Sequence, residues 1–503
     1  MIQKSFTYRG SLKSCNYACN YCPFAKHTSS QEQQKKDEKS WWQFCKQVQN
    51  MEEDRISILI APYGEALIHA YYTEGMASLS KLKQVGKIGC QTNLSIEVGE
   101  WIKQLETYNA DFDKITLWCT YHPSMVDITT FVEKIIQLSS KINLSVGVVG
   151  DPEQIVLIQK LRECLPLHIY LWINKMDGLR RKYTQEEINI FQKIDPMFAL
   201  ELTNKTKAPV CEGGKQHFFV NANGSMQPCN RNRTVLGNLY EQDENIYRTE
   251  QAFVCQSKKC DCYLAYAHHM DVKLLHFFGN QKLQRVPQRL KLQALFIDVD
   301  GTLLTKDGML ESGSKEAIKY LSQKMPIYLV TELPYTYAMK RCNSIKAFLT
   351  GGCFAKGAHL VDFQDPYEHY TYLPEEIEQM YPEALHFEKH QNRPYKARLK
   401  HKLPKALKSQ IISQLMQANK YQLTNTQQRT SILSQGVSKW QGIEQLCSQK
   451  GLDLKQIMTV GNSLEDIEMI SKAPYSVAVP TGIGMLKNKA TYILEIRQLP
   501  YIL

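Results

Sequence analysis

Near the N-terminus, three cysteines lie within the stretch SLKSCNYACNYCPFAK, residues 11–26. Cys15, Cys19 and Cys22 have the spacing C-x3-C-x2-C, and the next cysteine in the chain is Cys45. Thiolates spaced in this way on one loop can converge on one soft metal site. Three thiolates on a four-iron cube leave one iron without a protein ligand, so that it can bind a second molecule. The spacing favours such an open iron site, and the alternative is zinc with a distant fourth ligand.

Five further cysteines form a second group, in a segment (206–279) rich in cysteine, glycine and short polar hairpins. They are Cys211, Cys229, Cys255, Cys260 and Cys262. Five thiols on one segment exceed the four ligands of a closed metal site. Zinc held by this segment would be such a site. The remaining seven of the fifteen cysteines occur singly and are expected to be small buried side chains.

Paired carboxylates mark a third candidate site, in FIDVDGTLL at residues 296–304. Asp298 and Asp300 stand two apart at the end of an apolar run, and residues i and i+2 of a strand point the same way. There they can share a Mg²⁺ ion, which prefers oxygen ligands, while one oxygen still faces a phosphorus atom. The pattern predicts phosphate chemistry with Mg²⁺.

The elements that must position these residues follow an α/β pattern. Six apolar strand candidates alternate with amphipathic stretches up to about residue 175, which favours a parallel sheet, either barrel-like or doubly wound. The candidates span 5–9, 55–60, 87–92, 114–121, 144–149 and 168–173. Active sites of such folds lie at the carboxyl ends of the strands, and the loop with Cys15 directly follows the first strand.

This first part of the chain resembles the radical S-adenosylmethionine (SAM) superfamily. The three-cysteine motif has an aromatic residue, Tyr21, before its last cysteine. YGEALI (63–68) is similar to the family's Gly-Gly-Glu-Pro motif, with Tyr63 in place of the first glycine. QTN (91–93) is similar to its threonine–asparagine motif, and VGVVGDPEQ (146–154) to its glycine segment near the adenine.

The resemblance implies a partial (β/α)6 TIM-like barrel that holds a [4Fe–4S] cluster on Cys15, Cys19 and Cys22. The open iron would chelate SAM, and an electron donor such as flavodoxin or ferredoxin would drive its cleavage to a 5′-deoxyadenosyl radical. The residues implied in cofactor binding are Tyr21, Gly64, Glu65, Ala66, Thr92, Asn93 and Gly147. Tyr121 and His122, which follow the fourth strand, could contact substrate or serve packing.

The second cysteine group resembles the auxiliary-cluster extensions, called SPASM or twitch, of radical SAM enzymes. This likeness implies a second [4Fe–4S] cluster, with a purely structural role as the alternative. YRGSLKSCNYACNYCPFAK and CQSKKCDCYLAYAHH also resemble a group that includes aminoglycoside epimerases, in which a cysteine donates a hydrogen atom to the substrate radical. Cys255, Cys260 and Cys262 are candidates for that donor, and the crowded pair Cys260 and Cys262 is favoured.

From residue 292 to its end, the chain resembles haloacid dehalogenase-like (HAD) phosphatases. FIDVDGTLL is similar to their first motif, and the later motifs follow in order: Thr331 in YLVTELP, Lys439 in GVSKWQG, and VGNSLEDIEM at 460–469. The resemblance implies that Asp298 attacks phosphorus and that Asp300 acts as general acid and base. Thr331 and Lys439 would neutralise the phosphoryl oxygens.

The same resemblance assigns the Mg²⁺ shell to Asp298, Asp300, Asn462 and Asp466. The family usually has Asp where Asn462 stands, and often Asn where Glu465 stands. Because the loss of one carboxylate weakens metal binding, a degenerate domain that only binds phosphate is the alternative to an active phosphohydrolase.

The chain is expected to divide into four regions. These are a barrel (1–205), an auxiliary-cluster region (206–279), a basic linker (280–291) and a Rossmann-like HAD domain (292–503). The stretch between Thr331 and Lys439 exceeds the needs of a Rossmann core, so an α/β cap is expected at about 366–434. Its Lys-, Arg- and His-rich segment 386–402 could attract an anionic substrate.

Composition is that of an ordinary globular protein: 503 residues, 43% hydrophobic and 22% charged. The net charge of +11 is spread out and forms no basic block of the nucleic-acid-binding kind. No apolar run reaches the ~18 residues of a membrane helix, and MIQKSFTYRG lacks a signal pattern. We expect a cytoplasmic protein that acts on a small molecule, without nucleic-acid or membrane partners.

Together, the two halves favour a bifunctional enzyme. Its first half would carry out a SAM-dependent radical modification, such as epimerisation, of a carbohydrate-like small molecule, and its second half would hydrolyse a phosphate ester. One alternative is peptide modification, which needs an entry domain for which the start at SFTYRG leaves no room. The other is a cluster protein with a phosphate-sensing HAD domain.

Overall fold

The structure is a computed structural model of the 503-residue chain, with an α/β fold. It describes residues 4–22, 28–52, 55–203, 211–241, 255, 260, 262–269, 274–279, 282–425 and 430–503. The chain divides into two compact units, Met1–Arg289 (unit 1) and Leu290–Leu503 (unit 2). Within the described ranges, no helix has the length and apolar character needed to cross a membrane.

Unit 1 is built on a nine-stranded sheet with the order β6-β5-β4-β3-β2-β1-β7-β8-β9. Strands β1 to β6 are parallel neighbours in chain order, β7 pairs with β1 in parallel, and β8 and β9 follow antiparallel. The strands are β1 (Lys4–Gly10), β2 (Ile56–Ile60), β3 (Val85–Thr92), β4 (Ile115–Tyr121), β5 (Asn143–Gly150), β6 (Leu171–Lys175), β7 (His217–Asn221), β8 (Ser225–Gln227) and β9 (Gly237–Asn238). All six predicted strands are present. The last begins later than predicted, because residues 166–170 form the turn that leads into it.

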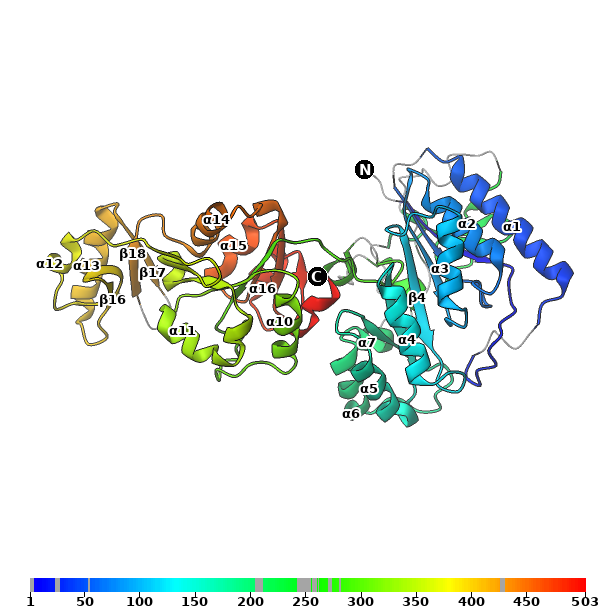
Figure 1. Ribbon diagram of the computed structural model, residues 1–503, viewed down its shortest axis with the longest axis horizontal. Coiled ribbons are helices and arrows are strands. Elements are labelled where there is room, and N and C mark those ends of the chain that lie inside the picture. The colour runs from blue at the N-terminus through cyan, green and yellow to red at the C-terminus, as the bar shows by residue number, and fades with distance from the viewer. Residues whose placement is uncertain are drawn as a thin grey trace. The chain divides into compact units, whose positions relative to one another are not determined.

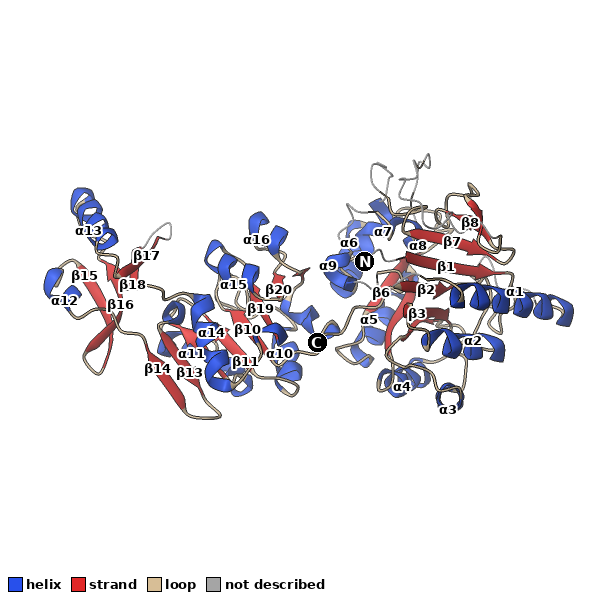
Figure 2. Ribbon diagram, turned by 90° about the horizontal axis from the view of Figure 1, so that it is seen from above, coloured by secondary structure: helices blue, strands red, loops and turns tan. Residues whose placement is uncertain are grey.

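Helices connect the successive parallel strands of unit 1, as parallel pairing requires. Between β1 and β6 these are α1 (Gln31–Gln49), α2 (Ala70–Ser80), α3 (Val98–Thr107), α4 (Ile128–Ser139) and α5 (Ile155–Cys164). Helices α6 (Gln185–Ile194) and α7 (Phe198–Thr203) lie between β6 and β7 in the chain, and α8 (Tyr263–Tyr266) and α9 (Leu275–Phe278) follow β9. Helix α1 begins at a capping box formed by Ser30 and Gln33. In α3, Val98, Trp101 and Leu105 form the buried stripe. Helices α2, α3 and α4 lie along one face of the sheet (Figures 1 and 2).

Of the segment predicted as a linker (280–291), residues 282–289 pack into unit 1. Gln284 donates from Nε2 to Ser57 Oγ at 2.7 Å, and Asn143 Nδ2 donates to the Pro287 carbonyl at 2.8 Å. Arg285 is fully buried, with its guanidinium 4.5 Å from the Trp172 ring centroid. These contacts make residues 282–289 part of the first unit, and the division between the units falls after Arg289.

Unit 2 contains an eight-stranded sheet with the order β14-β13-β12-β11-β10-β19-β20-β21. Its strands are β10 (Ala294–Asp298), β11 (Ile327–Val330), β12 (Gly351–Phe354), β13 (His359–Asp362), β14 (Tyr367–Tyr370), β19 (Ile457–Gly461), β20 (Tyr475–Ala478) and β21 (Tyr492–Ile493). Its helices are α10 (Ser314–Ser322), α11 (Tyr335–Arg341), α14 (Lys439–Lys450), α15 (Ile467–Lys472) and α16 (Gly484–Lys489). Strand β10 is central and parallel to β11 and β19, so the ends of these three strands meet at one edge.

A four-stranded antiparallel sheet is inserted in unit 2, with the order β15-β16-β18-β17. It comprises β15 (Leu385–His390), β16 (Arg393–Leu399), β17 (Tyr421–Asn425) and β18 (Thr430–Ser434), together with α12 (Glu376–Met380) and α13 (Lys405–Gln417). Ala397 and Ile432, which pair across β16 and β18, belong to one buried cluster with Ile411 and Leu415 of α13. Figure 1 shows α12 and α13 beside this sheet. An inserted α/β cap is thus present, although β14 belongs to the eight-stranded sheet.

Candidate functional sites

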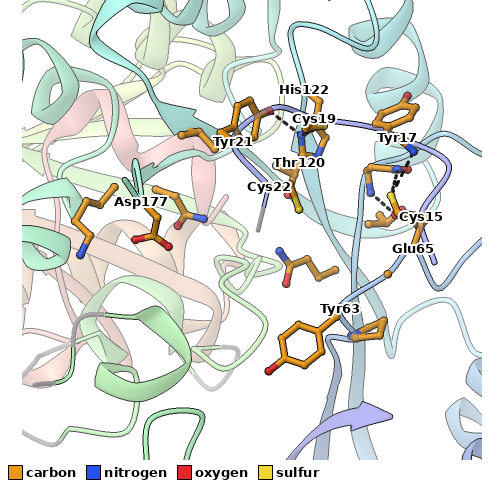
Figure 3. A pocket seen from close by; sticks show the side chains of 18 residues that line it. Cys15, Tyr17, Cys19, Tyr21, Cys22, Tyr63, Glu65, Thr120, His122 and Asp177 are labelled. Carbon is orange, nitrogen blue, oxygen red and sulfur yellow. Dashed lines mark hydrogen bonds between the residues drawn. The ribbon is translucent and has the colours of Figure 1, made fainter. Parts of the chain in front are cut away.

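A cavity of about 230 Å³ opens in unit 1 at the carboxyl ends of β1 to β6. Its wall comprises Cys15, Tyr17, Cys19, Tyr21 and Cys22 after β1; Pro62, Tyr63, Gly64 and Glu65 after β2; Gln91, Thr92 and Asn93 near the end of β3; Thr120 and His122 near the end of β4; Val149 in β5; and Asn174, Lys175 and Asp177 at the end of β6. Figure 3 shows these side chains around the opening. The three cysteines of the first group therefore share one cavity with the YGEALI and QTN segments.

Donors from the chain itself surround the Cys15 sulfur. Its Sγ atom accepts hydrogen bonds from the Tyr17 amide at 3.4 Å and from Asn93 Nδ2 at 3.5 Å. Burial raises the pKa of the Cys15 thiol, and burial with the nearby Cys22 raises the pKa of Cys19 to about 11. Both groups are therefore thiols at neutral pH until a cation favours the thiolate.

His122 bridges the cysteine loop and the fourth strand. Its Nδ1 atom lies 3.3 Å from Cys19 Sγ and is hydrogen-bonded to the Tyr21 hydroxyl at 2.8 Å. Burial lowers the pKa of His122 to about 4, so the ring is neutral. Tyr121 is buried against Phe131 instead, with ring centroids 5.1 Å apart. Of the two residues predicted to contact substrate or to pack, His122 lines the cavity and Tyr121 packs.

No three or more His, Cys, Asp or Glu side chains among the described residues form a group that could hold a metal ion. Two observations nevertheless fit an iron–sulfur group at the first cysteine loop. Three thiols line one cavity, and N–H groups donate to the sulfur of Cys15, as hydrogen bonds tune cluster sulfurs.

Glu65 ties two of the predicted motifs together. Its buried carboxylate accepts hydrogen bonds from Thr92 Oγ1 at 2.7 Å, the Asn93 amide at 2.6 Å and the Leu67 amide at 3.1 Å. Burial raises the pKa of Glu65, and these donors oppose the shift. The carboxylate of Glu65, which the resemblance implies in cofactor binding, is thus largely occupied by donors of its own chain.

Gly64 lies where the cysteine loop approaches the second strand. A β-carbon on Gly64 would stand 2.0 Å from the Ser14 carbonyl oxygen, and the next amide, that of Glu65, donates to this oxygen at 2.9 Å. Only glycine permits this approach. The close approach of the Ser14 carbonyl thus explains why glycine stands at position 64 of the cavity wall.

Two predicted cofactor residues, Ala66 and Gly147, do not line the cavity. Ala66 is fully buried in the core. A β-carbon on Gly147 would stand 1.9 Å from the indole of Trp172, its neighbour on β6. Glycine at position 147 is therefore explained by the packing of the tryptophan.

Asn174, Lys175 and Asp177 line the cavity but were not predicted. Arg285 donates from Nη1 to Asn174 Oδ1 at 2.9 Å and fixes the orientation of this amide. The sequence carried a signal, since NKMD directly follows an apolar strand at the end where active sites gather. No sequence signal indicated the contribution of Arg285, because it depends on a contact between residues far apart in the chain.

The described members of the second cysteine group influence one another. Burial raises the pKa of Cys211 to about 11, and Cys229, Cys260 and Cys255 add to the shift. Burial also raises the pKa of Cys229, with Cys260 and Cys255 contributing. Cys211 and Cys229 therefore each lie within electrostatic reach of Cys255 and Cys260.

Cys262 has different neighbours. Its Sγ atom accepts a hydrogen bond from Asn230 Nδ2 at 3.4 Å, and Asn230 Oδ1 accepts one from Arg9 Nη2 at 3.1 Å. The Arg9 guanidinium lies 4.4 Å from the ring centroid of Tyr63, which lines the cavity. A chain of contacts thus connects Cys262 with the cavity wall.

The carboxylate site of unit 2 is centred on a buried lysine. Lys439 Nζ donates to Asp298 Oδ1 at 2.7 Å and to Asp466 Oδ1 at 2.6 Å. Asp298 Oδ2 accepts from Thr302 Oγ1 at 2.8 Å. Asp466 Oδ2 accepts three hydrogen bonds from the amides of Asn462 and Ser463 and from the Ser463 hydroxyl. The structure thus brings together four of the predicted site residues: Asp298, Lys439, Asn462 and Asp466.

Burial and mutual charge set the protonation of this site. Burial and the neighbouring Asp466 raise the pKa of Asp298 to about 7. Burial lowers the pKa of Lys439, but the two carboxylates outweigh it and hold the pKa above its ordinary value. The lysine therefore stays charged and supplies a fixed cation beside the predicted nucleophile.

Asp300 and Thr331 occupy the margins of the site. Asp300 is exposed and forms an ion pair with Arg341. Thr331 is buried at the end of β11, next to β10, and its Oγ1 atom accepts a hydrogen bond from the Leu333 amide at 3.1 Å. The ion pair with Arg341 and the hydrogen bond from Thr302 to Asp298 were not predicted.

Asn462 fits the role of a Mg²⁺ ligand. Its Oδ1 atom is buried without a hydrogen-bond partner, and its Nδ2 atom lies 2.1 Å from the place of a β-carbon on Gly301. An amide oxygen without a partner, in the loop that also binds Asp466, is the hard donor that Mg²⁺ prefers. Asp298, Asn462 and Asp466 would hold the ion.

Comparison with known proteins covers this second unit. Haloacid dehalogenase-like hydrolases match residues 295–381 and 360–497. The phosphoglycolate phosphatase of Methanosarcina acetivorans is 25% identical over 213 residues, covering 41% of this chain and 91% of the relative. The phosphoglycolate phosphatase of Methanosarcina mazei is 25% identical over 210 residues, with the same coverage. A solved haloacid dehalogenase-like hydrolase from Bacteroides thetaiotaomicron shares 16% identity at a TM-score of 0.38, covering 42% of this chain and 98% of that chain.

The two family matches together extend from the first strand of unit 2 to its last helical turn. They include Asp298, Lys439 and Asp466, which hydrogen bonds join in the fold, and Thr331 at the margin of the site. Unit 2 is therefore a haloacid dehalogenase-like hydrolase domain, an enzyme of the phosphatase type whose family implies Mg²⁺.

Proposed function

We propose that the chain is a bifunctional enzyme. Unit 2 hydrolyses a phosphate ester of a small molecule, and unit 1 carries out a SAM-dependent radical modification of a related molecule. The observation that carries the hydrolase part is Lys439, which bridges the carboxylates of Asp298 and Asp466 at 2.7 and 2.6 Å.

In the hydrolase part, Asp298 attacks the phosphorus atom and forms an aspartyl phosphate, which water then hydrolyses. Asp300 gives a proton to the leaving oxygen and later accepts one from the attacking water. Its exposed carboxylate must leave Arg341 to do so. Thr331 and Lys439 neutralise the phosphoryl oxygens. When bound, Mg²⁺ supplies charge stabilisation of the phosphoryl group.

The substrate of unit 2 is proposed to be a small phosphorylated anion. A cavity of about 330 Å³ lies between core residues Glu332, Leu333, Pro334 and Tyr337 and the cap residues Lys396, Arg398 and Ser431. Cationic side chains on the cap suit a leaving group that is itself negatively charged. The relatives named phosphoglycolate phosphatase support a substrate of this size.

Release of inorganic phosphate from a panel of small phosphate esters tests the hydrolase part. We expect turnover that requires Mg²⁺ and disappears in Asp298→Asn. Binding of inorganic phosphate without turnover of any ester would instead identify a phosphate-binding domain.

For unit 1, the proposal rests on three thiols that line one cavity with the QTN segment. Cys15, Cys19 and Cys22 would hold a [4Fe–4S] cluster, and the donors to Cys15 would tune its sulfur. When bound, the cluster and SAM supply a radical able to take a hydrogen atom from carbon. The residues of the chain hold SAM and exclude water, and flavodoxin or ferredoxin would deliver the electron.

The second cysteine group divides in this proposal. Cys211, Cys229, Cys255 and Cys260 would hold an auxiliary [4Fe–4S] cluster, since Cys255 and Cys260 both lie within electrostatic reach of Cys211 and of Cys229. Cys262 would donate a hydrogen atom to the substrate radical, because Asn230 and Arg9 connect it with the wall at Tyr63. A second electron and a proton would then restore its thiol. Hydrogen return to the opposite face of the carbon gives epimerisation.

Anaerobic reconstitution with iron and sulfide tests the radical part. We expect iron-dependent formation of 5′-deoxyadenosine, and solvent deuterium in the product, delivered by the exchangeable Cys262 thiol. Cys262→Ala should retain both clusters and lose the deuterium. A product free of deuterium would contradict hydrogen donation by a thiol. A cross-linked peptide product would instead identify unit 1 as a peptide-modifying enzyme.

A further inference from the structure

Unit 2 contains a strained turn at Ala355, Lys356 and Gly357. Their φ angles are +48°, +64° and +101°, so three successive residues adopt the left-handed region. Residues with a β-carbon avoid this region, and lysine is an unfavourable choice there, whereas asparagine and glycine are tolerated. Strain of this kind persists only where the surroundings enforce it, and it concentrates at functional sites.

Backbone contacts tie this turn to two catalytic segments. The Lys356 amide donates to the Thr331 carbonyl at 2.8 Å, and the Ala355 amide donates to the Leu333 carbonyl at 2.9 Å. A β-carbon on Gly357 would stand 2.3 Å from the carbonyl oxygen of Ser438, the residue before Lys439. The turn is therefore fixed against the end of β11, which Thr331 follows, and against the start of α14, which carries Lys439.

The Lys356 side chain reaches a third catalytic segment. Its ammonium group is buried, lies 3.3 Å from Glu332 Oε1 and forms an ion pair with Glu465. Glu332 directly follows Thr331, and Glu465 directly precedes Asp466. Burial raises the pKa of Glu332, yet Lys356, Lys439, a hydrogen bond with Glu465 and Lys396 together hold it below its ordinary value. One cation thus stands between two carboxylates that flank the site.

We infer that Lys356 is a positioning residue of the hydrolase, which neutralises Glu332 and Glu465 so that a phosphate dianion can bind beside them. This inference rests on the proposed phosphatase function. Without Lys356, the carboxylates of Glu332, Glu465, Asp298 and Asp466 would have one positive charge fewer to balance them. The excess negative charge would repel the substrate, and most strongly its phosphate group.

The alternative is that Lys356 has a structural role only, as a buried ion-pair partner that stabilises the turn. Charge neutralisation and structural support make opposite predictions for a double variant. If the role is electrostatic, removal of Glu465 compensates for removal of Lys356, because one unpaired carboxylate disappears. If the role is structural, two lost partners are at least as harmful as one.

The test compares Lys356→Asn, Glu465→Gln and the double variant, by steady-state hydrolysis and by inhibition with inorganic phosphate. Asparagine suits the left-handed backbone, so Lys356→Asn relieves backbone strain and should fold, although the two carboxylates left without their cation lower its thermal midpoint. We expect KM and the inhibition constant of phosphate to rise about tenfold in Lys356→Asn, with the double variant within about threefold of the unaltered chain.

Lys420→Asn serves as the matched control, since Lys420 and Glu376 form an exposed ion pair at 2.7 Å in the cap. We expect it to leave both constants unchanged. Unchanged constants in Lys356→Asn, or a double variant at least as impaired as the single one, would overturn the inference and leave the phosphatase in place. An unaltered chain that hydrolyses no ester would refute the proposed function and this inference with it.

Discussion

The two candidate sites differ in how they compensate charge. In unit 2, Lys439 lies between Asp298 and Asp466 at hydrogen-bond distance, so the chain supplies its own counter-ion. In unit 1, Cys15 and Cys19 have raised pKa values and line a cavity as thiols. The first arrangement is organised by the chain alone, whereas the second is proposed to be completed by a bound cluster. The sites of the two units are thus expected to differ in how far they are formed before a ligand binds.

The largest effect is expected at the nucleophile of unit 2. Asp298→Asn removes the attacking carboxylate, and we expect phosphate release to fall at least about 10⁴-fold, as for other removed nucleophiles. The measurement is phosphate release at saturating Mg²⁺. Asp365→Asn, at an exposed aspartate paired with Lys450, is the control and should retain full activity. Substantial turnover in Asp298→Asn would remove the basis for an organised site in unit 2.

Loss of one thiol should affect unit 1 and leave the activity of unit 2 unchanged. Cys22→Ala leaves only two ligands at the first loop, and we expect this cluster's iron and sulfide to be lost while phosphate release is unchanged. Elemental analysis and the phosphate assay on the same sample measure this. Cys164→Ala, at an exposed cysteine, should keep its iron. Full iron content in Cys22→Ala would place the metal elsewhere.

A packing change should affect unit 1 without involving its metal. Gly147→Ala adds a β-carbon 1.9 Å from the Trp172 indole, and we expect a loss of ~1–3 kcal/mol in unfolding free energy. Denaturant unfolding measures it. Gly99→Ala, where the β-carbon meets only the Gln137 side chain at 3.5 Å, should be neutral or slightly stabilising. A neutral Gly147→Ala would reopen a role for Gly147 at the cofactor.

The smallest effect is expected in the Mg²⁺ shell. Asn462→Asp restores a carboxylate at the atom that now lacks a hydrogen-bond partner, and ligand charge raises affinity for hard cations. We expect the Mg²⁺ concentration at half-maximal rate to fall by roughly tenfold, with kcat little changed. Asn425→Asp, in the cap strand β17, is the control. An unchanged or higher Mg²⁺ requirement would show that Asn462 is not a ligand.

Much of the hydrolase site was predictable from the sequence, because its residues sit in short motifs directly after strands. Asp298 ends β10, Thr331 follows β11, and Asp466 lies in the loop after β19. Their meeting at one edge follows from parallel neighbours. Lys356 was missed, because its role depends on a turn that comes near Glu465 only in the fold.

In unit 1, strand positions and the cysteine loop followed from periodicity and spacing. Gly147 could not be judged in this way, since a glycine needed for the packing of Trp172 and one needed for a ligand look alike in sequence. Arg285 was taken as part of a basic linker, yet it is buried and hydrogen-bonded to Asn174. Basic composition alone does not reveal such a long-range partner.

The most direct test of the contrast between the units is the metal content of the chain purified without oxygen. Iron, sulfide and zinc are quantified in the unaltered chain and in a variant with Cys15, Cys19 and Cys22 replaced by alanine, each assayed for phosphate release. The account predicts iron and sulfide in the unaltered chain, loss of one cluster's share in the variant, and equal phosphatase rates in both. Zinc without sulfide in the unaltered chain would contradict it.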